Sequence, residues 1–202
     1  HSHPPKAPAN IFRIDVENGV VKAAVHNPPQ EKDALVHHIQ PKRVYLKRTA
    51  RSAGNPRQLV GVDRLESMLA ERGFVAIDPA TLTFAGQVVL LESAEVVVAP
   101  VGAALVNAIF APAGLKILAL APYFQGADYF YFSNMMGALG HEIHYIVGPQ
   151  IDQPDVHWLH RDYMVNLQGL ADALDRFCPQ TASLTVISGG KEAVGREEVA
   201  AS

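Results

Sequence analysis

An uninterrupted apolar run at residues 96–99 constrains the fold of this chain more than any other feature. The run of three valines and Ala99 lacks the alternation of a half-solvated strand, so it predicts a strand buried on both faces. Gly102, Ala103 and Ala104 follow, and their small side chains leave the backbone open to a ligand. A helix that begins there aims unpaired N–H groups and its positive dipole end at that space, which favours phosphate. The alternative is that Gly102 only allows a tight turn.

Strand-like and helix-like segments alternate along most of the chain. Short apolar runs predict strands at residues 43–47, 74–77, 96–99, 116–120 and 141–147. Apolar residues at helical spacing predict helices at 62–72, 84–94, 134–139 and 162–177, besides the one after Gly102. This order predicts an α/β fold, a three-layer Rossmann-like domain with a mostly parallel sheet and a ligand site at the carboxyl ends of the strands.

The two ends of the chain lie outside this alternation. Two β-prone runs flank Asn18-Gly19, a common hairpin turn, and predict a small N-terminal hairpin. The expected organisation is a hairpin and linker at 1–40, the Rossmann-like domain at 41–179, and a C-terminal strand and polar tail at 180–202.

Composition excludes several classes of protein. The net charge of -3 is small and the basic residues are spread along the chain, so nucleic acid is not an expected partner. Cys178 is the only cysteine and cannot form an internal disulfide. No apolar run reaches the roughly 20 residues that span a bilayer, and no signal peptide is recognisable. These features favour a cytoplasmic location, with contact to the inner membrane through partners.

The position of the small-residue turn argues against a dinucleotide cofactor. A dinucleotide site has its glycines after the first strand, where this chain has Lys47 and Arg48. A guanidinium at Arg48 and the amides at Gly102 instead suit a diphosphate. The alternative is that the arginines of this region are solvated loop charges, the interpretation we prefer for Arg51. A phosphate-binding hydrolase is disfavoured, because no nucleophile and base occur together.

An ordered series of short motifs runs through residues 41–150. It comprises Tyr45-Leu46-Lys47-Arg48, Arg64-Leu65-Glu66, Gly73-Phe74, Asp78-Pro79, Phe84, Gln87, residues 94–107, Phe110 to Gly114 and Leu118 to Pro122. This series resembles glycosyltransferase family 61, which includes capsular-polysaccharide biosynthesis proteins of bacteria. The resemblance implies one half of a GT-B glycosyltransferase, the C-terminal half that holds the nucleotide sugar.

The resemblance also implies the ligands and the residues that bind them. The expected ligands are a nucleotide-sugar donor, taken as UDP-linked, and a glycan acceptor, with no further cofactor and no metal. Arg48 would bind the donor diphosphate, and the turn at Gly102 would present its amides. By resemblance, the donor-binding residues are Arg48, Gln87, Gly102, Ala103, Ala104 and Asn107.

Three sites in the sequence, one of them a pair of residues, depart from the family pattern and leave enzymatic activity open. Val101 stands where the family has His, Ala119 stands where it has Glu, and Val60-Gly61 replaces an Asn-Glu pair. The alternative function is therefore a catalytically silent member that acts as an assembly or interaction module. The chain also lacks room before residue 41 for a second Rossmann-like half, so we expect either a missing half or a homo-oligomer.

No catalytic base can be named, and the remaining polar or aromatic clusters carry weaker expectations. Asp78 and Glu92 are carboxylates near element ends, where a capping or surface role is favoured. His141 to His144 is an incomplete metal motif, with Glu142 and His144 on one side of a strand. The aromatic run at 129–132 is expected to be extended with every second ring buried. Trp158 is expected to anchor the last helix, with sugar stacking as the alternative.

Overall fold

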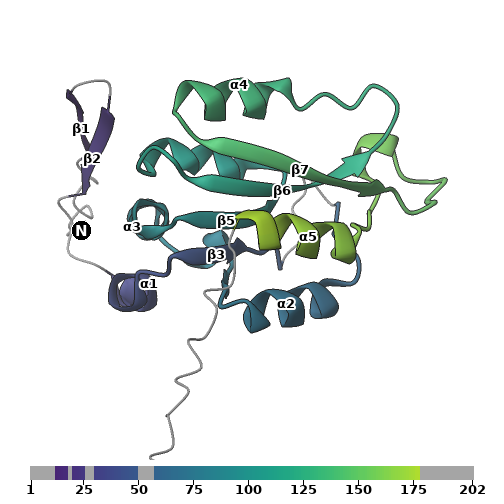
Figure 1. Cartoon of the computed structure of the whole chain (residues 1–202), viewed down its shortest axis with the longest axis horizontal. Helices are drawn as coiled ribbons and strands as arrows, with labels where there is room; N and C mark the ends of the chain where they lie inside the picture. The colour runs from purple at the N-terminus through teal and green to yellow at the C-terminus, as the bar shows by residue number, and fades with distance from the viewer. Residues whose placement is uncertain (1–11, 18–19, 26–29, 50–56, 178–202) are drawn as a thin grey trace, which may run out of the picture.

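A five-stranded parallel sheet forms the centre of the molecule (Figure 1). The computed structural model describes residues 12–17, 20–25, 30–49 and 57–177. The strand order is β4-β3-β5-β6-β7, and every neighbouring pair is parallel. The strands are β3 (Arg43–Leu46), β4 (Val75–Ile77), β5 (Val96–Pro100), β6 (Lys116–Tyr123) and β7 (Glu142–Pro149). The α/β fold with a Rossmann-like three-layer arrangement is confirmed.

The order in which successive strands are added to the sheet reverses once. The chain first steps outward from β3 to the edge strand β4, then crosses back so that β5 pairs with the other side of β3. Later strands continue outward in the opposite direction, through β6 to β7. In open α/β sheets the connections on the two sides of such a reversal diverge and leave a crevice at the carboxyl ends of the strands. That crevice lies between the ends of β3 and β5.

Helices cover both faces of the sheet, as Figure 1 shows. One face packs against α2 (Val62–Glu71) and α5 (Leu167–Phe177), whose buried leucines contact Tyr45, Val98 and Leu118. The other face packs against α1 (Ala34–Ile39), α3 (Phe84–Ser93), the 3-10 helix η3 (Ala103–Phe110) and α4 (Phe130–Ala138). Short 3-10 turns occupy η1 (Glu31–Asp33), η2 (Pro79–Thr81) and η4 (Trp158–His160).

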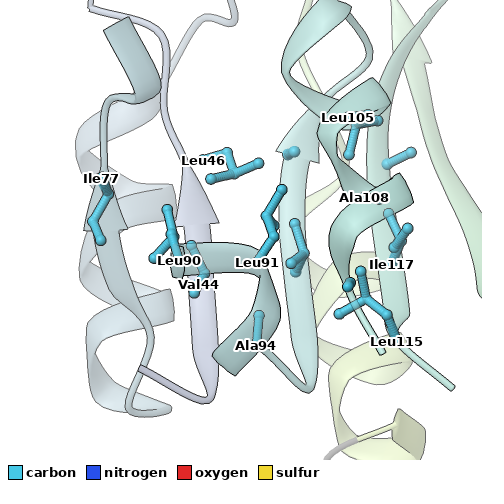
Figure 2. Packing of buried hydrophobic residues seen from close by; sticks show 14 of the residues in the cluster. Val44, Leu46, Ile77, Leu90, Leu91, Ala94, Leu105, Ala108, Leu115 and Ile117 are labelled. Carbon is cyan, nitrogen blue, oxygen red and sulfur yellow. The ribbon is translucent and has the colours of Figure 1, made fainter. Parts of the chain in front are cut away.

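The two hydrophobic cores, one on each face of the sheet, explain why residues 96–99 are apolar without alternation. Figure 2 shows Val44 and Leu46 of β3, Leu90 and Leu91 of α3, and Ile117 of β6 packed together on one face. Val97 and Ala99 face this core, whereas Val96 and Val98 face the opposite one. All four residues are buried because helices cover both faces.

A buried carboxylate attaches the N-terminal part of the described domain to α3. Asp33 is 1% exposed, and it accepts hydrogen bonds from the backbone N–H of Thr83, at 2.9 Å, and from the Thr83 hydroxyl. Thr83 in turn caps α3, because its hydroxyl accepts from the N–H of Gly86. The following helix α1 also packs Val36 into the core. The linker expected through residue 40 therefore contains a short packed helix, which its polar composition did not indicate.

Three segments differ from the sequence-based expectations. The helix after Gly102 is a 3-10 helix throughout its length. The last helix begins at Leu167 instead of Asp162, because the Asn166 side chain accepts hydrogen bonds from the N–H groups of Gln168 and Gly169 and so sets its start. The aromatic run expected to be extended lies in the first turn of α4, where Phe130 and Tyr131 are exposed while Tyr129 and Phe132 pack against the core.

The hairpin prediction is confirmed, because β1 (Phe12–Glu17) and β2 (Val20–Val25) pair as antiparallel strands. The predicted C-terminal strand and tail, and Cys178, lie outside the described residues. Within the part of the chain that the structure describes, no helix has the length and apolar character needed to cross a membrane.

Candidate anion-binding site

Arg48 and Gly102 meet at the crevice between β3 and β5. Arg48 follows β3, and Gly102 follows β5. A Cβ atom built on Gly102 would lie 2.5 Å from Nη2 of Arg48, so any larger residue would displace the guanidinium. Gly102 has an extended backbone with φ of 168°, so glycine is required here by space and not by backbone strain. The structure thus brings together two of the residues that the sequence assigned to one site.

The backbone after Gly102 presents free donors beside this guanidinium. Val101 still donates to Leu120 in the neighbouring strand, and the first bond within the turn runs from Leu105 N–H to the Gly102 carbonyl, at 3.0 Å. Among the described residues, the N–H groups of Gly102, Ala103 and Ala104 have no acceptor. A 3-10 helix leaves such first-turn donors unpaired, as an α-helix does. Unpaired backbone N–H groups next to a guanidinium favour the binding of an anion.

Arg57 is a second guanidinium at the same place, and the sequence-based assignment omitted it. Its side chain is only 9% exposed, so the view of it as a solvated loop charge is wrong, while Arg51 lies outside the described residues. Its Nη1 donates to the Leu159 carbonyl at 3.3 Å, and its Nε is buried without a partner among the described residues. The signal was present, because Arg57 lies three residues ahead of Val60-Gly61, which stand where the resemblance implies an Asn-Glu pair.

Two tyrosines complete the walls of this small cavity. Tyr45, Arg48, Arg57, Pro100 and Tyr163 line it together with Leu59 and Val62. The guanidinium of Arg57 lies 5.7 Å from the centroid of the Tyr163 ring, and the Tyr163 hydroxyl donates to the Leu120 carbonyl at 3.0 Å. This cation–π contact holds the buried guanidinium at the edge of the sheet.

The electrostatics of the cavity favour a negatively charged ligand. Burial lowers the pKa of the Arg57 guanidinium, and the positive charge of Arg48 lowers it further. Burial raises the pKa of Tyr163 to about 12, although both arginines act in the opposite direction. Arginine stays protonated under all such shifts. Neither arginine forms an ion pair within the described ranges, so an anion would be the first negative charge to offset them.

Gln87 and Asn107 form a support behind the turn. Nδ2 of Asn107 donates to Oε1 of Gln87 at 2.6 Å, and Nε2 of Gln87 donates to the Pro79 carbonyl at 2.9 Å. This chain of bonds ties η3 to α3 and to the turn after β4. It fits the expectation that both residues support the site, and a direct contact with a ligand stays a prediction.

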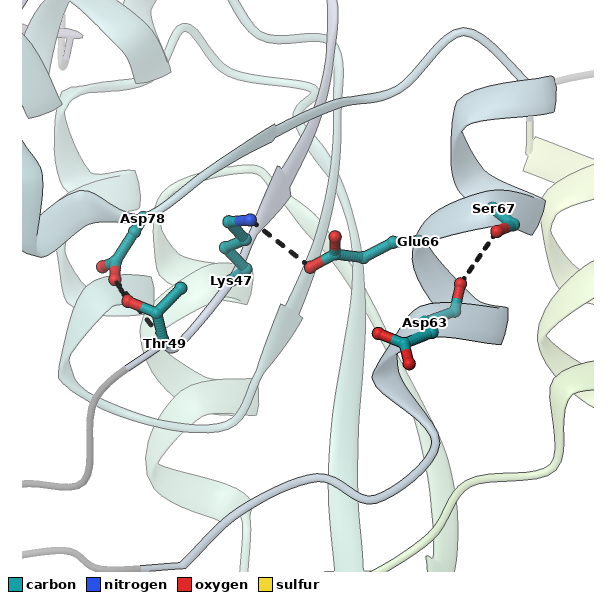
Figure 3. A network of polar contacts seen from close by, with 6 residues as sticks. All are labelled: Lys47, Thr49, Asp63, Glu66, Ser67 and Asp78. Carbon is teal, nitrogen blue, oxygen red and sulfur yellow. Dashed lines mark hydrogen bonds and ion pairs between the residues drawn. The ribbon is translucent and has the colours of Figure 1, made fainter.

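Asp78 fixes the segment that carries Arg48, as Figure 3 shows. Its carboxylate accepts hydrogen bonds from the N–H and the hydroxyl of Thr49 and caps η2 through the Ala80 N–H, at 2.9 Å. Burial alone would raise the pKa of Asp78, but these hydrogen bonds and nearby Lys47 hold it below the ordinary value. The expected capping role is confirmed. On the other side of Arg48, the Lys47 amine forms an ion pair with Glu66 of α2 at 3.6 Å.

Glu92 lies far from this site in the fold. It lines a pocket with Lys42, Glu95 and Gly114, which precede strands and so mark the opposite edge of the sheet. Burial raises the pKa of the Glu92 carboxyl even there. The parallel strands all run toward the arginines, so Glu92 cannot serve a reaction at their carboxyl ends.

Two of the positions that depart from the family pattern, Val101 and Ala119, point into the protein. Val101 is 6% exposed and Ala119 is fully buried, and both belong to the core beneath α3 and η3. Small apolar side chains are therefore packed where the resemblance implies a histidine and a glutamate. Val60 is exposed, and Gly61 has a φ of 80° at the start of α2.

The incomplete metal motif is divided between two sides of β7. His144 Nε2 lies 3.0 Å from Glu142 Oε1 on the surface, as expected from the alternation of a strand. His141 instead is buried, with Nε2 at 2.9 Å from the Ala108 carbonyl. In the described residues, no three His, Cys, Asp or Glu side chains gather in a way that could hold a metal ion.

Comparisons with known proteins bear on the family of the chain. A family model described as Glycosyltransferase 61 matches residues 12–118, more than half of the chain. The matched region includes the N-terminal hairpin, the crevice between β3 and β5, and the first three residues of β6. A search of curated proteins found no match.

Proposed function

This chain belongs to the glycosyltransferase 61 family, and we propose that it binds the diphosphate of a nucleotide-sugar donor between Arg48 and the Gly102 turn. The observation that carries the proposal is the contact between these residues. The guanidinium of Arg48 occupies the space above Gly102, beside three N–H groups without acceptors in the described structure. Arg57 adds a second, nearly buried positive charge. A diphosphate has the negative charge and the acceptor oxygens that this arrangement lacks.

The same groups suit the chemistry of glycosyl transfer. When the acceptor hydroxyl attacks the anomeric carbon, the bond from that carbon to the diphosphate breaks, and negative charge accumulates on the departing oxygen. Fixed guanidinium groups and backbone amides stabilise charge that develops at such a position. We propose that the chain supplies the donor-binding half of a transferase for capsule or other polysaccharide synthesis, with a UDP-linked donor. The cytoplasmic location stays a prediction.

A second candidate function rests on the buried departures from the family pattern. Val101 and Ala119 leave no polar side chain at positions where the resemblance implies two. Asp78, the carboxylate nearest in sequence to the strand ends, is engaged with Thr49 and Ala80. These observations favour a member that keeps the fold and acts as an assembly module without transfer activity.

Calorimetric titration with UDP, GDP, CMP and their sugar conjugates tests the first candidate. We expect saturable binding of one nucleotide, and Arg48→Ala should weaken it by about 1.5–3 kcal/mol, the range for a hydrogen bond to a charged group. Arg64→Ala, at an exposed position on α2, is the matched control and should bind like the unaltered protein.

The absence of binding would select the other candidate. If the folded protein binds none of these nucleotides, the anion site is not a donor site and the assembly module becomes the better proposal. Equal losses in both arginine variants would show a general effect of charge and would also contradict the assignment of Arg48.

A further inference from the structure

A second pocket opens at the carboxyl ends of β6 and β7. Its volume is about 660 Å³, within the range of small-molecule sites. It is lined by Tyr123, Phe124, Gln125, Pro149, Gln150 and Trp158. Tyr123 ends β6, Pro149 ends β7, and Trp158 begins the short helix η4. The pocket therefore shares one edge of the sheet with the arginine site, although three separate segments of chain build it.

Aromatic rings exposed to solvent form the main surface of this pocket. Tyr123 is 69% exposed and Trp158 is 46% exposed. The rings of Phe124 and Trp158 lie with their centroids 5.0 Å apart, at an interplanar angle of 52°. Such rings retain apolar surface that burial against a ligand would remove from water. Trp158 does not anchor the last helix as expected, because it packs against Phe124 instead.

Neutral polar groups accompany the rings. Nε2 of Gln150 donates to the Trp158 carbonyl at 2.5 Å, which orients the amide and leaves its oxygen as an acceptor. Gln125 is exposed, and its side chain has no hydrogen bond within the described residues. Among the residues that the structure describes, the lining contains no charged side chain. Such a lining offers no opposite charge to an ion, so it favours a neutral ligand with apolar faces and hydroxyl groups at its rim.

We propose that this pocket binds a neutral saccharide, and that the saccharide is part of the acceptor glycan. Pyranose rings offer C–H faces to aromatic side chains and hydroxyl groups to the glutamine amides. The binding of saccharide is argued from the pocket alone, whereas its role as acceptor rests on the proposed donor site.

The geometry favours a saccharide over the base of the donor nucleotide. The rings of Phe124 and Trp158 are inclined by 52°, so they form no parallel clamp that would hold a planar base between two faces. The pocket is also open and wide, with Tyr123 largely in solvent. A tilted pair of rings suits the puckered surface of a sugar chain.

The fluorescence of Trp158 gives a direct test, because it is the only tryptophan in the chain. The protein is titrated with maltotriose, cellotriose, xylotriose, mannotriose and chitotriose. We expect a saturable change with at least one trisaccharide, and a loss of affinity of about tenfold or more in Tyr123→Ala. Tyr131→Ala, another exposed tyrosine but on α4, is the matched control and should retain binding. Circular dichroism and thermal unfolding establish that both variants are folded.

A parallel titration with UDP separates the two proposals. Tyr123→Ala should leave UDP binding unchanged, and Arg48→Ala should leave trisaccharide binding unchanged. The saccharide proposal is overturned if no trisaccharide alters the fluorescence. It is overturned equally if Tyr123→Ala weakens UDP binding, since the pocket would then hold the base. Failure of UDP binding, with saccharide binding intact, would overturn the donor site and the acceptor role that rests on it, and would leave the saccharide site itself standing.

Discussion

The ends of β3 and β5 bear two guanidinium groups and unpaired backbone amides, whereas the ends of β6 and β7 bear aromatic rings and neutral amide side chains. Both regions lie on the carboxyl edge of one sheet. The charged region lies at the reversal of strand order, where a crevice admits a ligand close to the backbone. The aromatic region lies where longer strands and loops build walls from side chains. A crevice that lets a ligand reach backbone N–H groups thus suits an anion. A pocket whose walls are aromatic and amide side chains suits a larger neutral ligand.

Ala119→Glu should have the largest effect, because it places a carboxylate in β6, the strand of the aromatic region that pairs with β5 of the charged region. Ala119 is fully buried, so an unpaired charge there should lower the free energy of unfolding by about 3–5 kcal/mol. Urea denaturation measures this loss. Ala70→Glu, on the exposed surface of α2, is the matched control and should change stability little. A stable Ala119→Glu variant would mean that the core accommodates the family's glutamate.

Arg57→Gln should weaken the charged region and spare the aromatic one. Removal of a nearly buried guanidinium should reduce affinity for a nucleoside diphosphate by about 1.5–3 kcal/mol. Arg57→Lys should restore little of the affinity, because an ammonium lacks the planar fork and stacks poorly on Tyr163. Calorimetry with UDP provides the measurement. If Arg57→Gln binds UDP with full affinity, Arg57 does not contact the ligand and only supports the structure through its hydrogen bond to the Leu159 carbonyl.

Gly102→Ala tests whether the charged region depends on close approach of the ligand to the backbone. The new methyl group would meet Nη2 of Arg48, so the guanidinium must move, and we expect diphosphate affinity to fall by about 1 kcal/mol. The fold should persist, because φ at Gly102 is available to alanine. Gly137→Ala is the control, since a Cβ there has nothing within 4 Å. If Gly102→Ala leaves the affinity for diphosphate unchanged, Arg48 and the Gly102 turn do not bind the same ligand.

Asp78→Asn should have the smallest effect, and one that depends on pH. The pKa of Asp78 is lowered in the folded state, so its carboxylate stabilises the fold above the ordinary aspartate pKa of about 4. That contribution disappears as the pH falls through the folded pKa. We expect Asp78→Asn to cost about 1 kcal/mol at pH 7, and the difference to vanish in strong acid. Urea denaturation at both pH values measures it. A difference that is constant with pH would contradict the lowered pKa.

Much of the fold could be predicted because its signals are local. The valines at 96–98 indicate a strand buried on both faces, and the spacing of Leu65 and Leu69 indicates a helix with one apolar side. The start of α5 could not be placed by spacing alone, because the side chain of Asn166 decides it. The helical start of α4 was missed because aromatic residues are also frequent in strands.

The sequence by itself determined the alternation of strands and helices from residue 43 onward. It also determined the position of Arg48 after the first strand of the parallel sheet and of the small residues after the strand at 96–99. These follow from apolar periodicity and chain order, which need no knowledge of distant contacts. Only the tertiary structure decided that Arg57 turns inward, because its burial depends on Tyr163, more than a hundred residues later. It also decided that Tyr123, Gln150 and Trp158 share a pocket, since strand pairing brings their segments together. Contacts of this kind arise from packing in three dimensions and leave no local pattern.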